Sequence, residues 1–265
     1  MVAMLASPTG KCIRHRIHRQ HRSTIGRPVA LQPFAEPRAS RPDGAKRGYF
    51  GESAARPDHM MNSSKPGRTS VTSRINQPTL HHVNLKTTRL QEMIDWYGTV
   101  VGSRPNFQFP GGAWLTNDGA NHRIALLTSP RMSDDPDKLV HTGMHHIAFE
   151  YGNFNDLLDT YARLLELGIK PHMSLDHGVT TSFYYVDPDG NSVELQYDNF
   201  DDWNKSSEWM RTSREFASNP IGVPVDPSKM VAARNGGASR DDLHRRAFAG
   251  EFPPSEPFDP RVPLD

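Results

Sequence analysis

The segments LHHVNL, at residues 80–85, and MHHIAF, at residues 144–149, decide how this chain is organised. Each carries a His-His pair followed by alternating apolar and polar side chains, which is the pattern of a half-buried strand. Corresponding residues of the two segments are 64 positions apart (80 against 144). Such a repeat indicates that one structural unit occurs twice and sets the architecture.

The sequence after the first segment predicts a helix and three short strands. Four apolar side chains recur at helical spacing within residues 89–102, and Gly102 supplies a C-terminal stop. Gly-Gly and Asp-Gly turn signals then separate three strand-like stretches. The stretches are 105–110, 112–117 and 122–129.

The second segment opens the same order of elements. A helix is expected over residues 155–168, with Asn155 as its N-cap and Gly168 as its stop. The tight-turn sequence DPDGN, at 187–191, joins the last two of the strands that follow. These strands are 170–175, 181–187 and 191–198.

The chain therefore reads as an α+β protein with one central domain between two extensions. The domain spans residues 78–200 as two βαβββ modules, at about 78–129 and 142–200. Residues 1–77 are expected to be a disordered or targeting tail, since residues 1–35 hold six basic and no acidic side chains. Residues 201–265 are expected to form a helical tail that lies on the domain, followed by a frayed Pro- and Gly-rich end, without recognisable chemistry.

Composition excludes several classes of protein. The net charge of +1, from 31 basic and 30 acidic residues, argues against a nucleic-acid binder. The sequence contains no apolar run of about 18 residues, so it predicts no membrane span. The single cysteine, Cys12, rules out an internal disulfide and multi-cysteine metal sites. A reducing compartment is expected: the cytoplasm, or the mitochondrion if the Arg-rich start is a transit peptide.

The paired histidines suggest a metal site. Neighbouring side chains on a strand point to opposite faces. His81 shares its face with apolar residues, so His82 is expected to face a cavity, and the same reasoning selects His146 over His145. In the last strand, Glu194 lies on the polar face between two apolar neighbours. Two imidazoles and a carboxylate form a facial triad with open positions, which suits Fe(II) and oxygen chemistry.

The motifs HHVNL, HHIAF and FYYVDPDGNSVEL resemble the vicinal oxygen chelate superfamily over about residues 79–200. This superfamily includes glyoxalase I, fosfomycin- and bleomycin-resistance proteins and the type I extradiol dioxygenases. The resemblance implies that the modules form a curled mixed sheet around a central metal cavity. It also implies His82, His146 and Glu194 as metal ligands.

Within that superfamily, the resemblance favours a one-domain extradiol dioxygenase. Glyoxalase-type members generally add a fourth ligand, Glu or Gln, where this chain has Ala125. By resemblance, His122 is the acid–base residue, Tyr184 hydrogen-bonds the bound diol, and His177 is a further active-site histidine. The spacing from His177 to Tyr184 is shorter than in the family pattern.

The expected activity is ring cleavage of a catechol-type aromatic diol by O₂, with Fe(II), or alternatively Mn(II), as cofactor. Such a role belongs to the catabolism of aromatic compounds. One alternative is a glyoxalase-like lyase or isomerase, which would work without O₂. Another is a binding or resistance protein without turnover, which would not need the triad. A homo-oligomer is a further expectation from the resemblance.

Overall fold

A computed structural model describes residues 77–263 of the chain. The predictions made for the N-terminal tail therefore lie outside the described residues. None of the helices in the described part is both long enough and apolar enough to cross a lipid bilayer.

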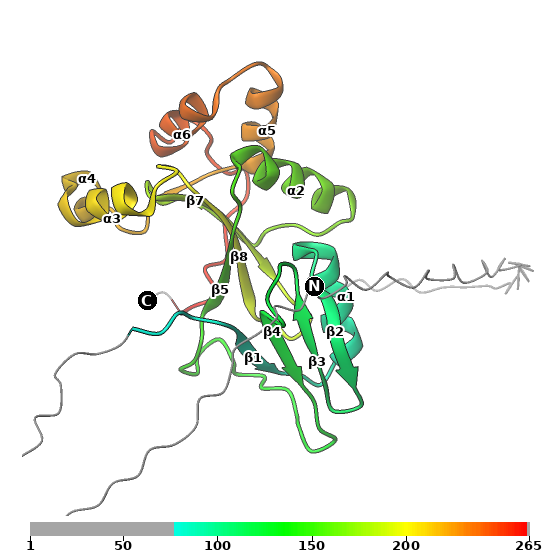
Figure 1. The fold of residues 1–265 in the computed structure, drawn as a ribbon. Helices are drawn as coiled ribbons and strands as arrows, with labels where there is room; N and C mark the ends of the chain where they lie inside the picture. Colours follow the sequence, from blue (N-terminus) through cyan, green and yellow to red (C-terminus); the bar gives the residue numbers. More distant parts are fainter. Residues whose placement is uncertain (1–76, 264–265) are drawn as a thin grey trace, which may run out of the picture. The chain divides into compact units, whose positions relative to one another are not determined.

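The first module contains the predicted strand–helix–strand–strand–strand order (Figure 1). Gly102 ends its helix in the left-handed conformation, with φ 68°, so its N–H reaches the carbonyl of Tyr97. The elements are β1 (Val83–Lys86), α1 (Leu90–Val101), β2 (Arg104–Phe109), β3 (Gly112–Thr116) and β4 (Ile124–Leu127).

The second module repeats this order. Its helix is capped by Asn153, whose side chain accepts from the N–H of Asn155, so the predicted cap at Asn155 was wrong by two residues. Buried apolar side chains at helical spacing, Leu157, Leu158 and Leu164 among them, turn the helix toward the sheet. The elements are β5 (His146–Glu150), α2 (Phe154–Glu166), β6 (Met173–Asp176), β7 (Thr180–Val186) and β8 (Ser192–Asp198).

The strands form two separate mixed sheets and not one continuous sheet. The first sheet has the order β1-β4-β3-β2, and the second has the order β5-β8-β7-β6-β9, with β9 (Val223–Pro224) added by the C-terminal extension. In each module the first and last strands run parallel: Asn84 pairs with Ala125, and Ala148 pairs with Glu194. The register therefore makes Ala125 the first-module counterpart of Glu194. The family resemblance had placed the fourth ligand of glyoxalase-type members at this same residue.

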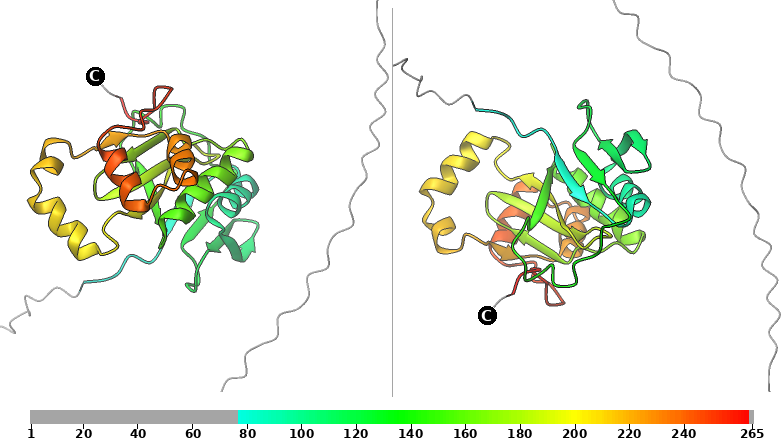
Figure 2. Two further views of the ribbon diagram at one scale, coloured as in Figure 1. Left: turned by 90° about the horizontal axis from the view of Figure 1, so that it is seen from above. Right: turned by 90° about the horizontal axis from the view of Figure 1, so that it is seen from below.

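The C-terminal extension packs against the second module, and this includes the Pro- and Gly-rich part that was expected to be frayed. Its residues Met230 and Leu243 are fully buried in the same core as α2 and the inner face of β7 and β8. Figure 1 and Figure 2 show α3 and α4 (yellow) projecting to one side, and α5 and α6 (orange) near α2. The helices are α3 (Trp203–Thr212), α4 (Arg214–Ser218), α5 (Pro227–Asn235) and α6 (Arg240–Phe248).

Contacts between the modules run through α1. The buried Tyr97 hydroxyl donates to Asp187 in the DPDGN turn, at 3.2 Å. Arg89 forms an ion pair with Asp189 of the same turn, at 2.7 Å, and Val193 of β8 belongs to the core cluster under α1. The turn therefore joins β7 to β8 and also ties the second module to the first.

Candidate metal centre

The outer face of the second sheet carries a connected group of polar side chains. His146 Nε2 lies 3.0 Å from Glu194 Oε2. The Tyr184 hydroxyl donates to Glu194 Oε1 at 2.9 Å and lies 2.8 Å from His177 Nε2. Three of these side chains come from β5, β7 and β8, where alternation turns them away from the apolar core. His177 follows β6, so each of the four strands of the second module, β5 to β8, contributes to the group or ends beside it.

The environment of this group fixes the charge on Glu194. Its side chain is 5% exposed, and burial alone would raise the pKa of the carboxyl. Hydrogen bonds from His146, Ser182 and Tyr184 outweigh burial and lower this pKa below its ordinary value, so Glu194 is a carboxylate. Burial raises the pKa of Tyr184, which stays a neutral donor, and lowers the pKa of His177.

A second group of histidines lies on the first module. Among residues 77–263, the one group of three possible metal-binding side chains whose ligand atoms all lie within 4.8 Å is His81, His82 and His122. The rings of His82 and His122 have centroids 4.2 Å apart. Burial, followed by the neighbouring His82 and His81, lowers the pKa of His122. His122 lies just before β4, although it was predicted within that strand.

The predicted ligands are therefore divided between two half-sites. His146 and Glu194 face each other, and their donor atoms fit a divalent cation. Among residues 77–263, His82 is not grouped with them within 4.8 Å, and its ring lies beside His122. The set of three ligands thus stays a prediction. Within one chain, two of the three residues, His146 and Glu194, lie together.

Two histidines that the sequence reasoning missed support the second half-site. His145 Nε2 lies 2.9 Å from the carbonyl of Pro260, and His145 Nδ1 lies 2.8 Å from His146 Nδ1. His172 Nδ1 lies 2.6 Å from the carbonyl of Asp259, and its Nε2 lies 2.9 Å from Ser192 Oγ. Carbonyls accept only, so they fix which ring nitrogens carry the proton. No signal in the sequence linked residues 259–260 to these histidines.

The C-terminal extension also holds the turn that carries His177. The carbonyl of Ile221 accepts a hydrogen bond from the His177 ring. Gly222 lies against this turn at φ +93°, where an added Cβ would come within 2.6 Å of the His177 Cα. On the other face of β6, His244 of α6 lies 2.8 Å from the fully buried carboxylate of Asp176, which accepts from the N–H of Gly178 at 2.8 Å.

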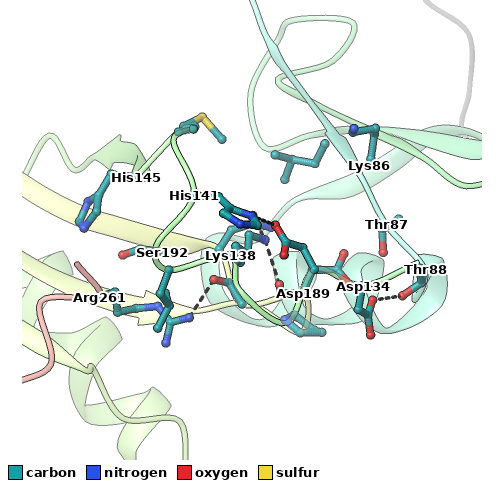
Figure 3. Close-up of a pocket in the computed structure, with 18 of the residues that line it drawn as sticks. Lys86, Thr87, Thr88, Asp134, Lys138, His141, His145, Asp189, Ser192 and Arg261 are labelled. Carbon is teal, nitrogen blue, oxygen red and sulfur yellow. Dashed lines mark hydrogen bonds and ion pairs between the residues drawn. The ribbon is translucent and has the colours of Figure 1, made fainter. Parts of the chain in front are cut away.

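The described part of the chain has two cavities near these groups. The larger, about 1020 Å³, lies between the modules and is lined by β1, residues 132–145, the DPDGN turn and Arg261 (Figure 3). None of the six predicted site residues lines it, and two of its cations are engaged by the protein: Lys138 donates to Asn191, and Arg261 donates to the carbonyl of Gly190. The smaller cavity, about 490 Å³, includes His177. We therefore place the chemistry beside the smaller one.

Fold and half-sites together define a two-module α+β protein with histidine and carboxylate groups facing outward from the sheets. The chain belongs to the Glyoxalase/Bleomycin resistance protein/Dioxygenase superfamily, whose family model matches residues 79–195. The fold and the family that the sequence motifs predicted are thus confirmed.

Two relatives narrow the comparison to dioxygenases. Biphenyl-2,3-diol 1,2-dioxygenase 2 from Rhodococcus globerulus is 40% identical over 180 residues, which is 68% of this chain and 94% of the relative. Biphenyl-2,3-diol 1,2-dioxygenase 3 from the same organism is 37% identical over 65% of this chain and 90% of the relative. A glyoxalase/bleomycin resistance protein/dioxygenase domain from Frankia sp. EAN1pec, with 17% identity and a TM-score of 0.41, covers 46% of this chain and 93% of its own.

Proposed function

We propose that this protein is an Fe(II)-dependent extradiol dioxygenase that cleaves the ring of a catechol-type aromatic diol with O₂. The observation that carries the proposal is the buried, charged Glu194 opposite His146, with Tyr184 and His177 connected to it. The names of the two Rhodococcus relatives support the same reaction. Ala125 occupies the position equivalent to Glu194 in the first module, so the fourth ligand that a glyoxalase-type site would need is missing there. A cytoplasmic location remains part of this proposal.

Each residue has a role that follows from its position. His82, His146 and Glu194 would hold the metal, which when bound supplies the redox chemistry that lets O₂ react with a diol. Tyr184 has its hydroxyl between Glu194 and His177, so it would orient a hydroxyl of the substrate. His122, whose lowered pKa keeps the imidazole neutral, would accept or return a proton.

The direct test is oxygen consumption by protein loaded anaerobically with Fe(II), on addition of catechol or biphenyl-2,3-diol. We expect oxygen uptake matched by a yellow ring-cleavage product, and neither in His146→Ala. Mn(II) loading under the same conditions tests the alternative metal. No uptake with either diol, from protein that retains its metal, would contradict the proposed function.

The position of His82 raises a separate question, because the proposed triad needs it beside His146 and Glu194. Two arrangements meet this need: movement of the two sheets within one chain, or supply of His82 by a second copy of the chain. Mixing His82→Ala with Glu194→Ala, through co-expression, distinguishes them. If each chain of a symmetric dimer supplies His82 to its partner, half of the dimers formed are mixed. One of the two metal sites in each mixed dimer is intact, so about a quarter of the wild-type metal sites are restored.

Sites formed within one chain restore none in the same experiment. Metal content is the readout, together with the molecular mass in solution, so the result does not depend on turnover. Restored metal in a dimer would confirm the predicted homo-oligomer as a functional unit. An unchanged baseline would assign the third ligand to movement within the chain.

A further inference from the structure

The smaller cavity lies between the outer face of the second sheet and helices α3 and α4. We call these two helices, which project in yellow in Figure 2, the arm (residues 203–218). The sheet side of this cavity comes from β5, β7 and β8 and the turn after β6. The arm and the residues after it supply the opposite wall. The lining residues from that wall are Trp203, Ser206, Ser207, Met210, Phe216 and Pro220.

The cavity continues directly from the half-site around Glu194. Gln196 lines the cavity and lies two residues further along β8 on the same face, which is about 7 Å along a strand. His177 belongs to both, because it lines the cavity and contacts the Tyr184 hydroxyl. A molecule held at Glu194 by one end therefore extends into this cavity with the other.

Most polar side chains of this cavity already have a hydrogen-bond partner within the protein. Glu150 accepts from the Trp203 indole at 2.9 Å and from Gln196 at 3.2 Å. Ser206 donates to Asp198 at 2.7 Å. A charged or strongly polar ligand group would find these partners engaged, and would lose its hydration without replacement.

The arm offers apolar surface to the same space. Trp203 is 70% exposed and Met210 is 46% exposed, values that are high for large apolar side chains and that leave them free to pack on a ligand. Phe216 and Pro220 extend this wall. The volume of about 490 Å³ falls within the range of small-molecule sites, and a one-ring diol coordinated at Glu194 would leave it unfilled.

We propose that this cavity is the subsite for an apolar, aromatic substituent of the diol, and that Trp203 and Met210 of the arm decide which substituted diols are accepted. The proposal rests on the proposed dioxygenase function for the identity of the reacting end. It assigns a role to residues 203–220, a stretch outside the matched family region of residues 79–195. The arm would thus set specificity while the modules set the reaction.

The test compares Met210→Trp, which fills the cavity, with Leu167→Trp as a matched control. Leu167 is also an exposed apolar residue, 58% exposed, but it follows α2 and does not line the cavity. In Met210→Trp, the ratio of kcat/KM for biphenyl-2,3-diol to kcat/KM for catechol should fall at least about tenfold, since losing apolar pocket space has effects of this size. Leu167→Trp should leave the ratio at the wild-type value.

A second measurement separates the subsite from the reaction. Metal-free protein is titrated with biphenyl, which has no hydroxyls, and binding is followed by calorimetry. Biphenyl binding that weakens in Met210→Trp but not in Leu167→Trp supports the subsite. This holds even if no diol supports oxygen uptake, because that failure would contradict only the proposed function. Equal biphenyl affinity in wild type and Met210→Trp, or an unchanged kcat/KM ratio, would overturn the subsite.

Discussion

Glu194→Ala is expected to lose more than about 100-fold in affinity for Fe(II), and with it all oxygen uptake on diols. Even residues that only orient a ligand change metal affinity by about 10- to 100-fold, so the removal of a direct ligand should exceed that. Glu194 is 5% exposed and accepts hydrogen bonds from three neighbours, which position its oxygens before a metal arrives. Anaerobic competition against a coloured chelator measures the affinity.

Two companion variants make this result specific. Glu166→Ala removes an exposed carboxylate at the end of α2 and should keep the wild-type affinity. Glu194→Gln retains an acceptor for the Tyr184 hydroxyl, which separates the loss of the ligand from the loss of the hydrogen bond. If Glu194→Ala, still folded by circular dichroism, bound Fe(II) as tightly as wild type, Glu194 would leave the ligand set.

His122→Phe is expected to bind Fe(II) as wild type does and to lower kcat by about 10²- to 10⁴-fold, the usual contribution of a positioned acid–base group. The phenyl ring replaces the imidazole in shape beside His82, so packing is preserved while proton transfer is lost. Single-turnover oxygen uptake gives the rate, and the chelator competition gives the affinity.

This variant also distinguishes the two half-sites. His122 belongs to the histidine group whose ligand atoms lie within 4.8 Å of one another. If His122→Phe lost its metal, the ion would be assigned to His81, His82 and His122 and not to the proposed triad. Full turnover would remove His122 from the mechanism. His141→Phe, an exposed histidine paired with Asp135, serves as the control and should change neither quantity.

The modules could be predicted from the sequence because their signals are local. Alternation along a strand predicted that the two side chains of each His-His pair point to opposite faces. In β5, Ile147 and Phe149 form the half-buried face, and His146 is exposed. Turn chemistry located the β7–β8 hairpin, where Asp187 accepts from the N–H groups of Asp189 and Asn191 at 3.0 and 2.8 Å. These features depend on residues a few positions apart.

The C-terminal extension could not be predicted in the same way. Its prolines and glycines suggested a frayed end, whereas Met230, Leu243 and Phe252 complete a core that α2 and the second sheet leave open. The apolar residues that matter are few and far apart, and only the opposing surface makes their burial favourable. The same holds for His244 on Asp176, a contact between residues 68 positions apart.

By itself, the sequence determined the repeated βαβββ unit, the family, and the side of the strand on which His146 and Glu194 lie. Those properties follow from the two-residue period of a strand and from motifs within one module. The tertiary structure decided which side chains meet: His146 with Glu194, His82 with His122, and the arm with the cavity beside them. Those meetings depend on how sheets and helices pack across long separations in the chain, and no local pattern encodes that packing.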